Sequence, residues 1–99
     1  MDITITDRHG DVPADLREYV EQKVLKLDRY FEGVQWIKVI LEGHSDPKTA
    51  EIVIGAVRSN TLVAEVSDAD LHTAIDLVVD KAEHQLTRYK EKLKDRRSR

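Results

Sequence analysis

Residues 36–66, WIKVILEGHSDPKTAEIVIGAVRSNTLVAEV, decide the fold of this chain. The stretch holds three runs of β-forming residues, and residues that favour turns separate each run from the next. The three runs cover residues 36–41, 50–57 and 61–66. Consecutive strands with short connections favour antiparallel hairpins, so this part of the chain predicts most of one sheet.

One more strand and two helices are predicted around these runs. Ile3 and Ile5 alternate with threonines, which indicates a short half-buried strand. Apolar residues at helical spacing predict an amphipathic helix on each side of the three strands. The first stripe is Leu16, Val20, Val24, Leu27 and Phe31, in a helix that ends near Gly33, and the second is Leu71, Ala74, Ile75, Val78, Val79, Ala82, Leu86, Tyr89 and Leu93. Ser67 and Asp70 are predicted to form the capping box of the second helix.

The predicted order is β-α-β-β-β-α, an α+β fold in which two helices cover one face of a mixed or antiparallel four-stranded sheet. The 99 residues predict a single domain, 1–99, whose basic end at 94–99 is expected to fray. Trp36 and Phe31 are predicted to anchor the core. The sequence contains no cysteine, which excludes a disulfide, a thiolate metal site and a thiol nucleophile.

Charge is distributed unevenly along the sequence. Residues 81–99 carry eight Lys and Arg against three acids, a net charge of +5, whereas residues 1–80 carry a net charge of −8. Segregated positive charge allows a protein that is acidic overall to bind a polyanion.

Both predicted helices sort their cations to one flank. On the first helix, the basic flank holds Lys23, Lys26 and Arg29 with Tyr19 and Tyr30, and the acidic flank holds Glu18, Glu21, Asp28 and Glu32. On the second helix, the basic flank holds Lys81, Arg88 and Lys92 with His84 and Gln85, and the acidic flank holds Asp76, Asp80 and Glu83. Such flanks are either ordinary solvated faces or contacts for nucleic-acid phosphates and bases. We expect the cations of both helices to converge into one continuous ridge that binds RNA or DNA.

Other functions find little support in the sequence. The histidines lack metal-site spacing, the glycines are isolated, and no serine or threonine has a recognisable base partner. We therefore expect no metal, no cofactor, no small-molecule substrate and no enzymatic activity. The apolar runs are too short to span a membrane and no secretory signal is evident, which predicts a cytoplasmic protein. The alternative function is a protein-interaction module that uses the acidic flanks to contact a basic protein.

Two segments resemble a known family. Leu16-Arg17-Glu18-Tyr19-Val20, followed by Lys23, Lys26-Leu27 and Tyr30-Phe31, is similar to the first helix of the ribosome hibernation promoting factors. Asp70-Leu71-His72-Thr73-Ala74-Ile75-Asp76 is similar to that family's Asp-Met-Tyr-x-Ala-Ile-Asp, and the likeness continues through Asp80-Lys81, Gln85-Leu86-Thr87 and residues 90–94. These proteins are also called ribosome-associated inhibitors and, in older naming, sigma-54 modulation proteins. The resemblance covers nearly the whole chain.

The resemblance implies a fold akin to double-stranded-RNA-binding domains and a non-enzymatic role in ribosome hibernation. Such a protein binds the small ribosomal subunit in the channel for messenger and transfer RNA, and inhibits translation under stress or in stationary phase. Family members contact ribosomal RNA through basic side chains of both helices. The matching residues are Lys23, Lys26 and Arg29 on the first helix and Lys81, Arg88, Lys90 and Lys92 on the second.

Two positions depart from the family pattern. His84 stands where relatives usually have arginine, which weakens the basic flank of the second helix. His72 replaces the tyrosine of the motif. The chain resembles the short form of the family, so pairing of ribosomes is expected to need a separate protein. The older family name keeps open a role in regulating a transcription (sigma) factor.

Overall fold

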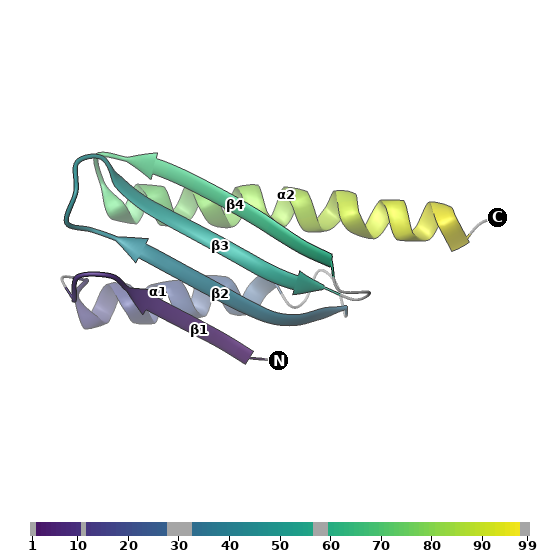
Figure 1. The fold of residues 1–99 in the computed structure, drawn as a ribbon, viewed down its shortest axis with the longest axis horizontal. Helices are drawn as coiled ribbons and strands as arrows, with labels where there is room; N and C mark the ends of the chain where they lie inside the picture. Colours follow the sequence, from purple (N-terminus) through teal and green to yellow (C-terminus); the bar gives the residue numbers. More distant parts are fainter. Residues whose placement is uncertain (1, 11, 28–32, 57–59, 98–99) are drawn as a thin grey trace.

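A mixed four-stranded sheet carries both helices on one face in this computed structural model (Figure 1). The structure describes residues 2–10, 12–27, 33–56 and 60–97, and the side chains of these residues up to Leu93. The elements are β1 (Asp2–Asp7), α1 (Ala14–Leu25), β2 (Val34–Glu42), β3 (Lys48–Ala56), β4 (Asn60–Asp68) and α2 (Leu71–Arg97). The predicted α+β fold and its β-α-β-β-β-α order are confirmed.

The strands lie in the order β1-β2-β3-β4. β1 is parallel to β2, whereas β2–β3 and β3–β4 are antiparallel pairs. A parallel pair needs a crossover connection, and α1 provides it between β1 and β2. One row of paired residues, Ile5, Val39, Ile52 and Ala64, points toward the helices across all four strands.

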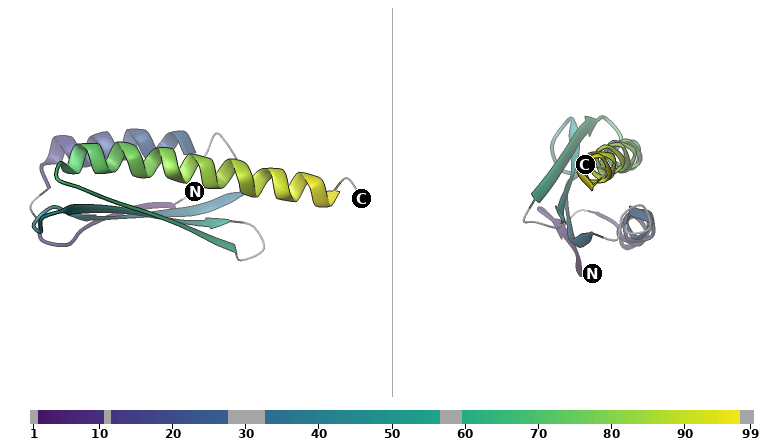
Figure 2. Two further views of the ribbon diagram at one scale, coloured as in Figure 1. Left: turned by 90° about the horizontal axis from the view of Figure 1, so that it is seen from above. Right: turned by 90° about the vertical axis from the view of Figure 1, so that its right-hand side faces the viewer.

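The core fills the layer between the sheet and the helices (Figure 2). α2 packs mainly on β4 and β3, whereas α1 contacts β1 and α2. Most of the predicted stripe residues are buried, because each stripe faces the apolar row of the sheet. Leu16 is partly buried, and Phe31 lies outside the described residues. The largest fully buried side chains are Leu27, Ile37, Leu41, Ile52, Ile54, Ile75 and Leu86.

α1 is shorter than the sequence predicts. Regular helix ends at Leu25, and Lys26 and Leu27 follow in a tighter 3₁₀ turn. Residues three apart superpose in such a turn, so Val24 and Leu27 both point into the core. The predicted helix end near Gly33 is therefore wrong, and the residues between 27 and 33 lie outside the description.

α2 starts differently from the prediction. Its N-cap is Asp70, whose Oδ2 accepts hydrogen bonds from the Thr73 amide at 3.1 Å and the Thr73 hydroxyl at 2.8 Å. Ser67 is part of β4 instead, opposite Thr49, because the β3–β4 ladder continues to Asp68. The predicted capping box is therefore wrong. The helix is described as far as Arg97, and the fraying expected at 94–99 stays a prediction. No described helix is apolar and long enough to cross a membrane.

Trp36 lies on the open face of the sheet, not in the core as predicted. The residue is 38% exposed, and its indole lies over Gly55, its partner on β3. A Cβ on Gly55 would stand 2.1 Å from Cε2 of the indole, so glycine is the residue that allows this contact. Val63, half-exposed on β4, belongs to the same face. The open face is therefore partly apolar.

The Gly55→Ala substitution tests this contact. The added methyl group should force the indole outward and destabilise the protein by about 1–3 kcal/mol. Trp36 is the sole tryptophan, so its fluorescence should shift to the red in the folded variant, and urea unfolding should report the stability. In a Trp36→Ala background the same glycine substitution should cost little, since the clash is gone. An equal cost in both backgrounds would contradict the packing described here.

Candidate nucleic-acid interface

The two helices meet at the carboxylate of Asp76 on α2. Its Oδ1 accepts a hydrogen bond from the Tyr19 hydroxyl of α1 and lies 4.0 Å from Nζ of Lys23. Its Oδ2 lies 3.5 Å from Nδ1 of His72, one turn earlier on α2. Asp76 therefore links Tyr19 and Lys23 of α1 to α2. Its negative charge attracts the ammonium group of Lys23 toward α2.

Tyr19 is the other centre of this contact. Its ring stacks on His72 at 4.4 Å between centroids, and the ammonium of Lys23 lies 5.5 Å from the ring centroid. The hydrogen bond to the Asp76 carboxylate raises the pKa of Tyr19, and burial and the negative charge of Asp76 act in the same direction. The phenol is therefore held in its protonated form, as the hydrogen-bond donor that this contact needs.

Cations on the other side of α2 face β4. Nζ of Lys81 donates to the carbonyl oxygen of Glu65 at 3.2 Å, and Nε2 of Gln85 donates to that of Val63 at 2.9 Å. β4 is an edge strand, and its outward carbonyl groups need partners. Lys81 and Gln85 therefore cover part of this edge. Further along α2, Arg88 and Lys92 border the start of β4.

The structure divides the predicted RNA-binding residues into two sets. The interhelix set is Lys23, on the flank of α1 that faces α2, together with the exposed Lys26 in the 3₁₀ turn that follows α1. The edge set is Lys81, Arg88 and Lys92 on the flank of α2 that faces β4. The flank of α2 that faces α1 carries Asp76, an acid. The expected continuous ridge is therefore wrong for the described side chains, because α2 lies between the two sets.

The remaining predicted residues lie elsewhere. His84 and Lys90 are exposed on α2, and Lys90 lies across the helix from Lys92 because two residues turn a helix by about 200°. Arg29 lies outside the described residues. The sequence prediction missed the role of Asp76. The i,i+4 spacing of His72 and Asp76 was a signal for it, but nothing in the sequence pointed to the partners on α1.

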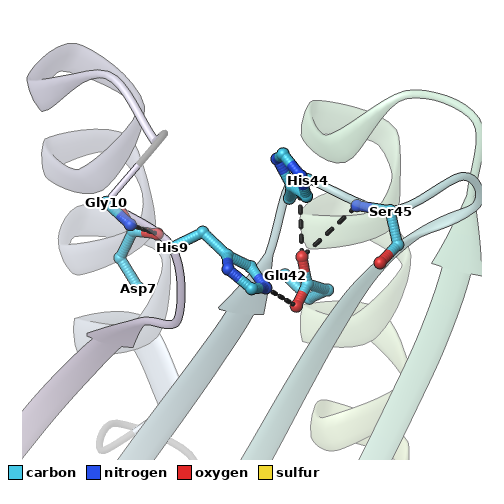
Figure 3. A network of polar contacts seen from close by, with 6 residues as sticks. All are labelled: Asp7, His9, Gly10, Glu42, His44 and Ser45. Carbon is cyan, nitrogen blue, oxygen red and sulfur yellow. Dashed lines mark hydrogen bonds and ion pairs between the residues drawn. The ribbon is translucent and has the colours of Figure 1, made fainter.

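His9 and His44 come together at the other end of the sheet (Figure 3). Their ring centroids are 5.0 Å apart, and Nε2 of His9 lies 2.7 Å from Oε2 of Glu42. The other oxygen of Glu42 accepts the amide protons of His44 at 2.9 Å and Ser45 at 3.3 Å. This network ties the β1–α1 loop to the β2–β3 loop. Within the described part of the chain, no three His, Cys, Asp or Glu side chains could hold a metal ion.

This structure belongs to the class of small α+β domains in which two parallel helices lie on one face of a mixed sheet (Figure 2). One solved member is the N-terminal domain of Protein Y from Thermus thermophilus, with a TM-score of 0.76 and 36% identity over 90% of this chain and 99% of that one. Another is a ribosomal subunit interface protein from Coxiella burnetii, with a TM-score of 0.79 and 26% identity over 92% of this chain and 99% of that one.

Relatives known by sequence give the same result. The ribosome hibernation promoting factor of Azotobacter vinelandii is 34% identical over 92 residues, which cover 93% of this chain and 85% of that protein. Residues 3–94 match the family described as sigma 54 modulation protein / S30EA ribosomal protein. The chain belongs to this family, and the resemblance noted in the sequence is confirmed.

The Asp76→Asn substitution tests the interhelix contact. It removes the negative charge and weakens the acceptor, so the pKa of Tyr19 should fall toward its ordinary value of 10.0. An NMR titration of the Tyr19 ring resonances measures the change. The control is Asp80→Asn, which removes an exposed acid one turn further along α2. A Tyr19 pKa that is the same in wild type and Asp76→Asn would contradict the contact.

The Glu42→Gln substitution tests the loop network through its pH dependence. The amide of His44, then the His9 ring and the amide of Ser45, hold the pKa of Glu42 below its ordinary value of 4.5. A depressed pKa stabilises the fold above the unfolded-state value, and this stabilisation is lost as the pH falls through the folded-state value. Glu42→Gln should therefore be less stable than wild type at neutral pH, and the difference should shrink below pH 4.5.

Urea unfolding midpoints of both proteins, measured from neutral pH down to about pH 3, give the stability difference as a function of pH. Glu65→Gln, at an exposed position of β4, is the matched control and should follow wild type throughout. A stability difference between Glu42→Gln and wild type that stays constant with pH would rule out a role for the charge of Glu42.

Proposed function

We propose that this chain is a ribosome hibernation factor that binds the small ribosomal subunit and inhibits translation under stress or in stationary phase. The observation that supports this most is family membership over residues 3–94, with relatives named for ribosome hibernation and for the ribosomal subunit interface. Binding and exclusion need no catalytic step and no cofactor. A ribosome binder works in the cytoplasm, and ribosome pairing would be left to a separate factor.

The proposed contacts are the cations of both helices with ribosomal RNA. Lys23 and Lys81 already have partners within the protein, so they are expected to contribute less than Lys26, Arg88 and Lys92. His84 and Lys90 add to the exposed surface of α2, and Arg29 belongs to the proposed set through its sequence match. Because α2 separates the two sets, the bound RNA must straddle this helix.

The proposed mechanism is occlusion. Cationic side chains bind phosphates and supply affinity, while the shape of the subunit channel supplies selectivity. The bound domain then fills space that messenger and transfer RNA need. Since phosphate contacts release counterions, binding should weaken steeply with salt, with a log–log slope of about −4 to −5 for six contacts on linear nucleic acid.

Charge reversal at Lys26 and Arg88 tests this proposal. Neither residue holds a described contact to Asp76 or to a backbone carbonyl, so Lys26→Glu and Arg88→Glu should leave the fold intact. Each should weaken co-sedimentation with the small subunit by roughly tenfold and lower the salt slope by about one unit. Wild type, but neither variant, should compete with transfer RNA for the subunit at equal concentration.

Arg17→Glu is the matched control, because Arg17 is an exposed cation on the opposite flank of α1. It should bind like wild type. Binding lost equally in all three variants would indicate a net-charge effect and no defined surface. Binding unaffected by Lys26→Glu and Arg88→Glu, but lost in Asp80→Lys, would favour the alternative, a protein-interaction module that regulates a sigma factor through its acidic flank.

A further inference from the structure

An open groove of about 520 Å³ lies between the start of β4 and the C-terminal half of α2. Figure 2 shows β4 diverging from α2 toward this end. Arg88 and Lys92 supply positive charge on the α2 wall, and Asn60 and Thr61 supply amide and hydroxyl groups on the β4 wall. The groove therefore combines cations with groups that both donate and accept hydrogen bonds.

The floor and one end of this groove are already fixed. Tyr89 is buried beneath it, and its hydroxyl accepts a hydrogen bond from Nδ2 of Asn60 at 2.9 Å. Gln85 lines the end nearest Lys81 and is held by its hydrogen bond to Val63. A preformed site with an apolar floor and a few oriented polar groups suits a small planar ligand.

We infer that this groove binds a single unpaired nucleotide, with its phosphate on Arg88 and Lys92 and its base against the β4 wall. The cations suit a phosphate, and the hydroxyl and amide groups of Thr61, Asn60 and Gln85 suit the polar edge of a base. The inference deepens the proposed function and rests on it for the source of the nucleotide, which is a ribosomal RNA strand and not the free nucleotide pool.

A peptide strand added to β4 fits the groove less well. Strand addition needs a row of outward backbone groups on the edge strand. Along this edge, Lys81 and Gln85 already cover the carbonyl groups of Glu65 and Val63. Every second residue of a strand points its backbone groups outward. The residue two positions before Val63 is Thr61, which lies in the groove. One residue is too short for a strand, but it is enough to contact one base.

NMR spectra of the isotope-labelled full chain, titrated with a short single-stranded oligoribonucleotide, test the inference. Saturable shifts of the Asn60 and Gln85 side-chain amides and the Arg88 guanidinium would support it. Parallel titrations use adenosine monophosphate and inorganic phosphate. Shifts with the oligonucleotide alone assign the site to an RNA strand, and equal affinity for the mononucleotide assigns it to a free nucleotide. No shifts with either ligand, or the same shifts with phosphate, would overturn the inference.

Lys92→Ala and Lys38→Ala form the matched pair for affinity. Both remove an exposed lysine, but Lys92 lines the groove, whereas Lys38 lies on the open face of the sheet and outside the proposed RNA-binding set. Lys92→Ala should weaken oligonucleotide binding about tenfold, and Lys38→Ala less than about twofold. Equal losses would overturn the inference. Groove binding in a protein that ignores the small subunit would refute the proposed function alone, and subunit binding without groove shifts would refute this inference alone.

Discussion

The burial of one side of α2 against β3 and β4 is the constraint on which the rest of this structure depends. Ala74, Val78 and Ala82 are almost fully buried on the sheet, and they fix the rotation of the helix about its axis. Each following residue is turned by about 100°, so every charged side chain of α2 has its direction set by this packing. Asp76 consequently faces α1, whereas Lys81 and Arg88 face the outer edge of β4.

The order of elements could be predicted because it depends on local periodicity. Apolar residues that alternate in a strand or recur at helical spacing are the residues that the fold buries. The sequence pattern therefore matches the elements of the structure. The relation between the helices could not be predicted in the same way. The sequence places each charge relative to its own stripe, but which flank faces the other helix depends on the strand order β1-β2-β3-β4. The sorting of charge on each helix was therefore foreseen, and its arrangement across the two helices was not.

Two local predictions failed because strand neighbours decided the position of a residue whose type suggested another role. Trp36 alternates with Ile37, Val39 and Leu41, all of which are buried, so strand parity puts it with Lys38 on the open face. Ser67 and Asp70 both suit a helix cap, and pairing of Lys48 with Asp68 takes Ser67 into the sheet. In both cases a residue type was weighed without its strand neighbours. Long-range pairing decides such positions, and residue preference comes second.

The length of α2 affects how the molecule meets a large charged partner. Its 27 residues span about 40 Å, whereas a nine-residue strand spans about 30 Å, so its end projects beyond the sheet (Figure 1). The projecting end is the cationic end of the chain, while Asp76, which contacts α1, lies near the opposite end of the helix. Such a molecule has a permanent dipole along its 49 Å axis. The field of a polyanion would orient the cationic end of α2 toward it before the two molecules touch. Because salt screens this field, the association rate should fall as ionic strength rises.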